Sequence, residues 1–127
     1  QPIQIAVHPT QANVVALATE QGLFLSDDYG NSLAQVGEAE TVTAVAFHPD
    51  GKQLLFGYQQ LASYDLASKQ ISALSAPTLG ADDGISYLAV NPTNTDELAL
   101  ATFAKDMYWS SDSGKTWTQI AAAGKTK

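Results

Sequence analysis

Two stretches, SDDYGNSL (Ser26 to Leu33) and SSDSGKTW (Ser110 to Trp117), share the pattern SxDxGx, then Ser or Thr, then a large apolar residue. Each stretch occupies the same place inside a longer unit, and this unit occurs three times along the 127 residues. Self-similarity at a fixed period is typical of repeat architectures. The sequence therefore predicts a repeat protein built from stacked units.

The period follows from the proline that ends the first apolar run of each unit. Pro9 and Pro49 are 40 residues apart, and Pro49 and Pro92 are 43 residues apart. A period of about 40 residues suits four short strands per unit, as in the blades of a propeller.

The apolar runs predict strands rather than helices, because they are only four to eight residues long and are separated by Pro, Gly, Asn and Asp. Each first run stops at His-Pro or Asn-Pro, where proline removes a backbone donor and favours extended geometry in the residue before it. We expect an all-β fold of twelve strands without helices. These strands form a β-propeller segment of three four-stranded antiparallel blades, at about residues 1–38, 39–80 and 81–127.

Composition limits the classes of partner. The formal net charge is −7, and all six basic residues are lysines, which argues against binding to nucleic acid or to an anionic membrane. The sequence has no apolar run long enough to insert into a membrane. The absence of cysteine excludes disulfides and thiolate metal sites but leaves the compartment open. We expect neither a cofactor nor a metal ion.

The two motifs and the blade-length period resemble the BNR or Asp-box propellers, a family that includes sialidases, xyloglucan-active glycosidases and sortilin-type receptors. The second motif matches the family pattern fully, and the first has Ser32 for threonine and Leu33 for the aromatic residue. The middle unit is degenerate, because it keeps Ser63 and Asp65 but has Ala67 in place of the glycine. The resemblance implies a propeller of the exported bacterial kind, located in the cell envelope or outside the cell.

In this family the motif is a turn between the third and fourth strands of a blade. Its aspartate accepts hydrogen bonds from backbone amides, its glycine takes a positive φ, and the last apolar residue, Leu33 or Trp117, lies under the turn. A calcium site is not expected, because the bidentate glutamate of helix-loop-helix sites is missing. We therefore assign a structural role to Ser26, Asp28, Gly30, Ser32, Ser110, Asp112, Gly114, Thr116 and Trp117.

Catalysis finds little support in the sequence. Sialidases, which the resemblance includes, clamp the substrate carboxylate with an arginine cluster, and this chain has no arginine. Other glycosidases need two carboxylates about 5 to 9.5 Å apart across a cleft, and sequence spacing alone places no pair there. We assign no catalytic residue.

In propellers, the turns between second and third strands and the connections between blades gather on one face. This rule predicts an acidic face that is either a solvated surface or a binding site for a cation, a carbohydrate or a basic peptide. Its members are Glu20, Glu38, Glu40, Asp82, Asp83, Lys105 and Asp106.

The two histidines are equivalent residues of successive units. His8 and His48 both precede a proline, and Asn91 takes this position in the third unit, so we interpret them as structural residues at strand ends rather than metal ligands. Trp109 and the neighbouring aromatic residues are interpreted as packing between blades.

Three blades cannot close a ring, because propellers need four to eight. The first and last blades would each leave one apolar face uncovered, and such patches mark interfaces. We expect these faces to be covered either by another copy of the chain or by the missing blades of a longer chain.

Three functions remain open. The first is a non-catalytic propeller that acts as a ligand-binding or protein-assembly platform. The second is a part of a glycoside hydrolase-like enzyme that uses the acidic loops. The third is a receptor-like propeller that binds peptides.

Overall fold

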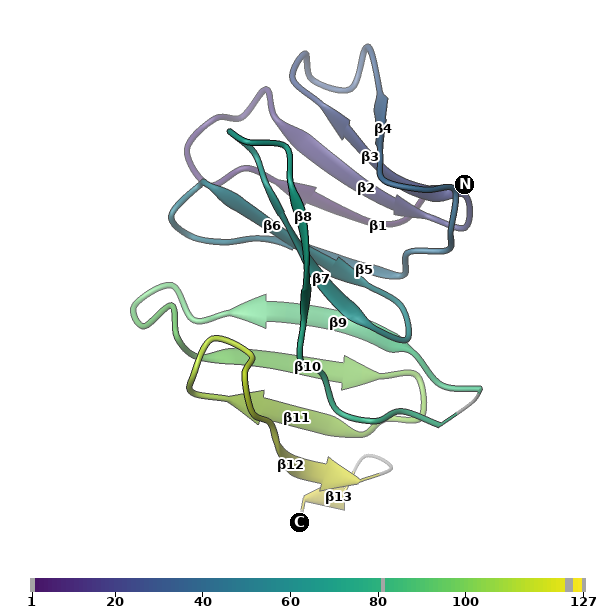
Figure 1. The fold of residues 1–127 in the computed structure, drawn as a ribbon, viewed down its shortest axis with the longest axis vertical. Helices are drawn as coiled ribbons and strands as arrows, with labels where there is room; N and C mark the ends of the chain where they lie inside the picture. Colours follow the sequence, from purple (N-terminus) through teal and green to yellow (C-terminus); the bar gives the residue numbers. More distant parts are fainter. Residues whose placement is uncertain (1, 81, 123–124, 127) are drawn as a thin grey trace.

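The computed structural model describes residues 2–80, 82–122 and 125–126, and its three antiparallel sheets are stacked along the longest axis of the molecule (Figure 1). We call these sheets blades one, two and three. Blade one contains β1 (Pro2–Val7), β2 (Val15–Thr19), β3 (Gly22–Ser26) and β4 (Ala34–Val36). Blade two contains β5 (Ala44–Phe47), β6 (Gln53–Gly57), β7 (Leu61–Asp65) and β8 (Ile71–Leu74). Blade three contains β9 (Ile85–Val90), β10 (Leu98–Thr102), β11 (Met107–Ser110), β12 (Thr118–Ala122) and β13 (Lys125–Thr126).

Every blade is an up-and-down meander in which consecutive strands are neighbours. The described residues contain strands and turns but no helix, so the all-β prediction is confirmed. Consequently, this part of the chain has no helical segment that could cross a membrane. Blade three differs from the expected four strands, because the short β13 pairs with β12 as a fifth strand.

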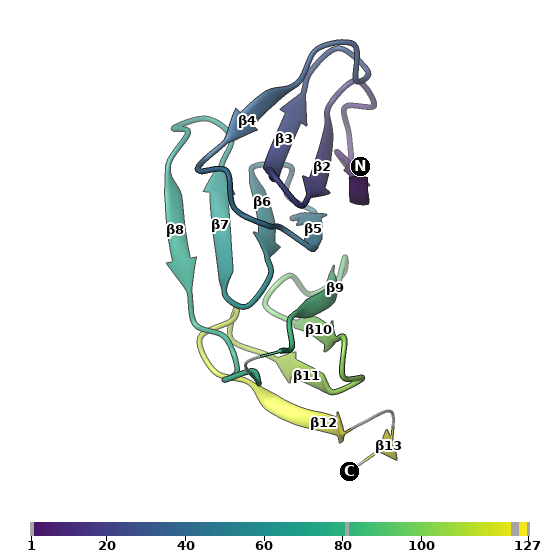
Figure 2. The same ribbon diagram turned by 90° about the vertical axis from the view of Figure 1, so that its right-hand side faces the viewer.

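The first strands of the blades lie side by side. β5 contacts β1 on one side and β9 on the other, whereas β4, β8 and β12 fan out as the outer strands (Figure 2). Backbone hydrogen bonds join the blades near these first strands. The amide of Val42 donates to Thr19 O at 2.9 Å, and the amide of Ile85 makes the equivalent bond to Tyr58 O.

Each pair of adjacent blades encloses its own apolar core, because successive side chains of a strand point to opposite faces. The first core lies between blades one and two and is built around Ala16, Leu23 and Leu54, which are fully buried. The second lies between blades two and three and is built around Leu55 and Leu100.

Equivalent positions can be compared by counting from the proline that ends each first strand. Ile5 in β1 corresponds to Val45 in β5 and to Leu88 in β9. In blades two and three this position belongs to the face that packs against the preceding blade, and we call that face, and its equivalent in blade one, the ridge. The opposite face, which packs against the following blade, we call the trough, and in blade one it is floored by Ala16 and Ala18.

The middle unit departs from the motif assignment made on the sequence. In blade one Val15 pairs with Ser26, the first serine of the motif, and the equivalent Leu54 pairs with Tyr64. Tyr64, rather than Ser63, therefore occupies the place of the motif serine, and its side chain is buried in the first core. Asp65 instead caps a short turn by accepting the amides of Ala67 and Ser68.

Candidate functional site

The two SxDxG turns have the same hydrogen-bond network. In the first, Ser26 Oγ donates to Asp28 Oδ1 at 2.7 Å and accepts the amide of Gly30 at 2.8 Å. Asp28 also accepts the amide and the hydroxyl of Ser32. The aspartate thus closes the turn from inside, which occupies both of its oxygens.

The second turn repeats this network with Ser110, Asp112 and Thr116. Gly30 and Gly114 have φ values of 89° and 87°, as the turn requires. The residues before them, Tyr29 and Ser113, are also left-handed, which sequence reasoning missed because neither is Gly, Asn or Asp.

These bonds favour the charged carboxylate. The Thr116 hydroxyl and amide, together with the Ser110 hydroxyl, lower the pKa of Asp112 from 3.8 to about 2. The hydroxyls of Ser32 and Ser26 likewise lower the pKa of Asp28. Both carboxylates are anions at neutral pH whose hydrogen-bonding capacity serves the turn.

The apolar residues that end the two motifs, Leu33 and Trp117, lie in different surroundings. Trp117 is half-buried against the second core, and its Nε1 donates to Ser75 O at 2.8 Å and to Gly114 O at 3.2 Å. Leu33 does not lie under its turn as expected, because its side chain is 51% exposed. The reason is positional: Ser75 follows the last strand of the blade that precedes blade three, and the described residues contain no blade before blade one.

A groove with a volume of about 800 Å³ lies on the acidic face between blades one and two. Glu20, Glu38 and Glu40 line it, and all three are exposed, so the structure brings these predicted residues together. No lysine is among the lining residues. Its apolar lining residues include the exposed Ile71, the half-buried Phe56 and the buried Val36, Val42 and Leu61.

Hydrogen bonds hold β4 and the β4–β5 connection, which carries Glu38 and Glu40, against the β2–β3 turn. Thr41 Oγ1 donates to Glu20 O at 3.1 Å, and Gln35 Nε2 donates to Gln21 O at 2.8 Å. Gly37, with a φ of 74°, turns the chain out of β4. The glutamates are therefore carried on loops that are tied to each other.

The remaining predicted residues lie further along the chain: Asp82 and Asp83 in the connection between blades two and three, and Lys105 and Asp106 in the β10–β11 turn. Asp82 and Lys105 are exposed, and Asp106 is half-buried. Asp83 is buried, and its Oδ1 accepts the amides of Gly84 at 2.8 Å and Ala104 at 3.0 Å.

Asp83 therefore ties two loops together and is withdrawn from the surface that a ligand could reach. Burial raises the pKa of Asp83, but the amide hydrogen bonds from Gly84 and Ala104 outweigh burial and leave it below its usual value. Gln59 Nε2 donates to Asp83 O and links this region to the groove.

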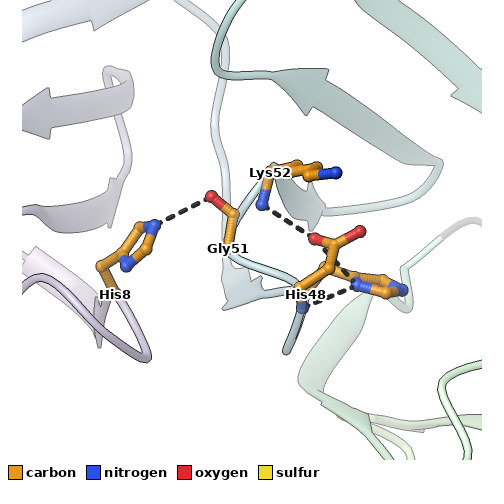
Figure 3. A network of polar contacts seen from close by, with 5 residues as sticks. His8, His48, Gly51 and Lys52 are labelled. Atoms are coloured by element: carbon orange, nitrogen blue, oxygen red, sulfur yellow. Dashed lines mark hydrogen bonds and ion pairs between the residues drawn. The ribbon is translucent and has the colours of Figure 1, made fainter.

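The histidines take structural positions. His8 is buried, and its Nε2 lies 2.8 Å from Gly51 O in blade two (Figure 3). Its Nδ1 accepts the amides of Thr10 and Gln11. Because Nδ1 accepts two amides, Nε2 carries the proton and donates to Gly51 O. His48 Nδ1 accepts the amide of Asp50. Within the described residues, no three His, Cys, Asp or Glu side chains gather as a metal site.

No protein-family model and no curated protein sequence matches the chain. Among solved structures, an ancestral GH74 enzyme is similar, with a TM-score of 0.74 and 20% identity over 96% of this chain. A GH74 xyloglucanase from Xanthomonas campestris gives a TM-score of 0.73 and 21% identity over 93% of this chain. YCF48 bound to D1 peptide gives 0.70 and 13% identity, also over 93%.

These similar structures are β-propellers, and the likeness confirms the predicted fold. This chain spans 18%, 21% and 38% of the three proteins, respectively. At these identities the likeness concerns the fold alone, because one propeller architecture carries many unrelated functions.

Proposed function

We propose that this chain is a non-catalytic propeller segment that acts as a binding platform, and that the groove between blades one and two takes an extended basic segment of a partner protein. The observation that carries the proposal is the pairing of an apolar wall with Glu20, Glu38 and Glu40, in a groove that no lysine lines. Alternating apolar and basic side chains of an extended peptide would contact the wall and the glutamates in turn.

A structural role for the SxDxG turns supports the non-catalytic part of the proposal. The carboxylate oxygens of Asp28 and Asp112 accept hydrogen bonds within their own turns, and Oδ1 of Asp83 accepts hydrogen bonds from two backbone amides. The similar structure of YCF48, which is described as bound to a peptide, favours the same kind of ligand.

The test is fluorescence anisotropy with a labelled alternating Lys-Val peptide, and with a Glu-Val peptide of equal length for comparison. We expect binding of the basic peptide only, weakened at high salt because the glutamates are exposed and screened. Glu38→Gln with Glu40→Gln should weaken binding by about five-fold, since each rim charge contributes a few tenths to 1 kcal/mol.

Asp27→Asn is the matched control, because it removes an exposed carboxylate at the other end of the strands of blade one. Equal affinity of both peptides, or an unchanged affinity in the glutamate variant, contradicts the proposal.

Carbohydrate is the second candidate, and the likeness to a xyloglucanase favours it. Xyloglucan oligosaccharides are therefore titrated in the same assay as competitors. Displacement of the basic peptide by the sugar, or release of reducing ends from it, would replace the peptide proposal with a glycan-binding or hydrolytic one.

A further inference from the structure

The two ends of the stack are uncovered apolar faces. On the ridge of blade one, Ile3, Ile5 and Val7 are exposed, with Ile5 at 60%. On the trough of blade three, Tyr87, Met107 and Trp109 are exposed. Together with Leu33, these residues account for seven of the eleven exposed large apolar side chains among the described residues.

Each end face is equivalent to faces that are buried inside the same molecule. Val45 and Leu88 take the position of Ile5 in blades two and three, and both are only 4% exposed, because the preceding blade covers them. The exposed Leu33 likewise corresponds to Trp117, which reaches the connection after blade two. The ridge of blade one therefore has the side chains of a face that a preceding blade covers.

The trough of blade three repeats the trough of blade one. Ala99 and Ala101 are equivalent to Ala16 and Ala18, which are fully buried under blade two, and Met107 is equivalent to the buried Leu23. Small residues on the middle strand, flanked by larger ones, leave room for the large side chains of a ridge. The trough of blade three and the ridge of blade one are thus complementary in shape, but they lie at opposite ends of the stack (Figure 1).

Equivalent turns of the two end blades carry one pair of opposite charges. Residues 1–38 contain four acidic residues and no lysine, and residues 81–127 contain six acidic residues and four lysines, so both segments are net acidic. The β2–β3 turn of blade one carries Glu20, and the equivalent β10–β11 turn of blade three carries Lys105. Both side chains are exposed, so a contact between these two ends brings the turn that carries Glu20 in one copy beside the turn that carries Lys105 in the other.

We propose that two copies of this chain associate head to tail, so that the ridge of blade one in each copy fills the trough of blade three in the other. Two such contacts related by a twofold axis close a ring of six blades, which lies within the range that propellers adopt. The proposal is independent of the peptide groove, which lies between blades one and two and outside both end faces.

The proposed contact between copies lacks one backbone hydrogen bond that is present in both contacts between blades of the same chain. Val42 and Ile85 donate their amides to the preceding blade, and Pro2 takes the equivalent position in blade one without an N–H. We therefore expect a reversible dimer that dissociates on dilution.

Sedimentation equilibrium over a wide concentration range tests the proposal. The expected result is a mass that approaches twice the 13.4 kDa of the chain as the concentration rises. A single-chain mass at all concentrations, or open chains that grow beyond two copies, overturns it.

Charge exchange tests the interface itself. Ile5→Glu on the ridge and Ala89→Lys on the trough each place a charge on an exposed end position, so both variants should fold, as circular dichroism checks. Each variant alone should weaken association by at least about ten-fold, or about 1.4 kcal/mol. An equimolar mixture should recover the dimer, since one contact is then native and the other pairs Glu with Lys.

Tyr29→Glu is the control, because Tyr29 is also exposed but lies in the first SxDxG turn, outside the strands of both end faces and outside the groove. Its dimer should equal that of the unmodified chain. Dimers that persist in both single variants, or a mixture that stays monomeric, overturn the head-to-tail arrangement. If the unmodified chain forms the dimer but does not bind the basic peptide, only the proposed function is contradicted.

Discussion

The indole Nε1 of Trp117 lies 2.8 Å from the carbonyl oxygen of Ser75, 42 residues earlier in the chain. This hydrogen bond fastens the last SxDxG turn to the connection that leaves blade two. Trp117 therefore serves two purposes, because it completes its own turn through Gly114 O and it holds blade three against blade two.

Trp117→Phe should lower the free energy of unfolding by about 1 kcal/mol, since the ring is kept but the indole donor is lost. Urea denaturation measures this difference. Trp109→Phe is the control with the same chemical change, and it should stay within about 0.5 kcal/mol because Trp109 is on the exposed end face. Equal losses in the two variants would mean that ring size, not the bond to Ser75, matters.

Gly51 offers a second test of how blades one and two are joined. Its φ is 72°, and an added Cβ would lie 2.8 Å from Cε1 of His8. Gly51→Ala should therefore cost about 1 to 3 kcal/mol, through backbone strain and through displacement of the histidine. Chemical denaturation gives the value.

Two further variants separate these causes. In a His8→Ala background, Gly51→Ala should cost less, because the clash is gone and only the backbone strain remains. Gly80→Ala should be neutral or stabilising by less than about 1 kcal/mol, because the nearest atom to its added Cβ is 3.9 Å away. If Gly51→Ala lowers the free energy of unfolding by the same amount with and without His8, the whole effect comes from strain in the backbone.

The sequence predicted the repeat well because its signals are local. Proline ends each first strand, and the SxDxG serine, aspartate and glycine encode a turn whose bonds stay within a few residues. The gathering of Glu20 with Glu38 and Glu40 was also predictable, since strand order alone decides which turns share a rim.

What the sequence could not predict depends on contacts between distant segments. Asp83 looks like a surface acid in a long loop, but the turn that contains Ala104 folds over it and makes it a buried acceptor. Leu33 matches the motif, yet its exposure depends on whether a blade precedes it. Tyr64 replaces the motif serine because strand register, rather than sequence spacing, sets the pairing.

The pH dependence of stability follows from the lowered pKa values of Asp28 and Asp112. A carboxyl whose folded-state pKa lies below 3.8 contributes stability above that pH, and this contribution is lost as the pH falls through the folded value, about 2 for Asp112. We expect stability to decline between about pH 4 and pH 2. Asp112→Asn should be less stable than the unmodified chain at neutral pH, and the gap should narrow toward pH 2.

Thermal melts across this range measure the effect, with Asp27→Asn as the control. Asp27 is an exposed neighbour of the first turn, so its removal should shift the melting temperature little at any pH. A gap between Asp112→Asn and the unmodified chain that is constant with pH would show that the carboxylate charge is irrelevant to the turn.

Leu54 tests the core that joins blades one and two. Its side chain is fully buried among Ala16, Leu23 and Tyr64, so Leu54→Ala leaves a cavity and should cost about 2 to 5 kcal/mol. Leu33→Ala makes the same chemical change on the exposed side of blade one and should cost less than about 0.5 kcal/mol in dilute solution. Urea denaturation at low protein concentration compares them, because dilution removes any contribution from contacts between copies. A small loss in Leu54→Ala would mean that blade one docks only through its backbone bonds, such as the one from Val42 to Thr19.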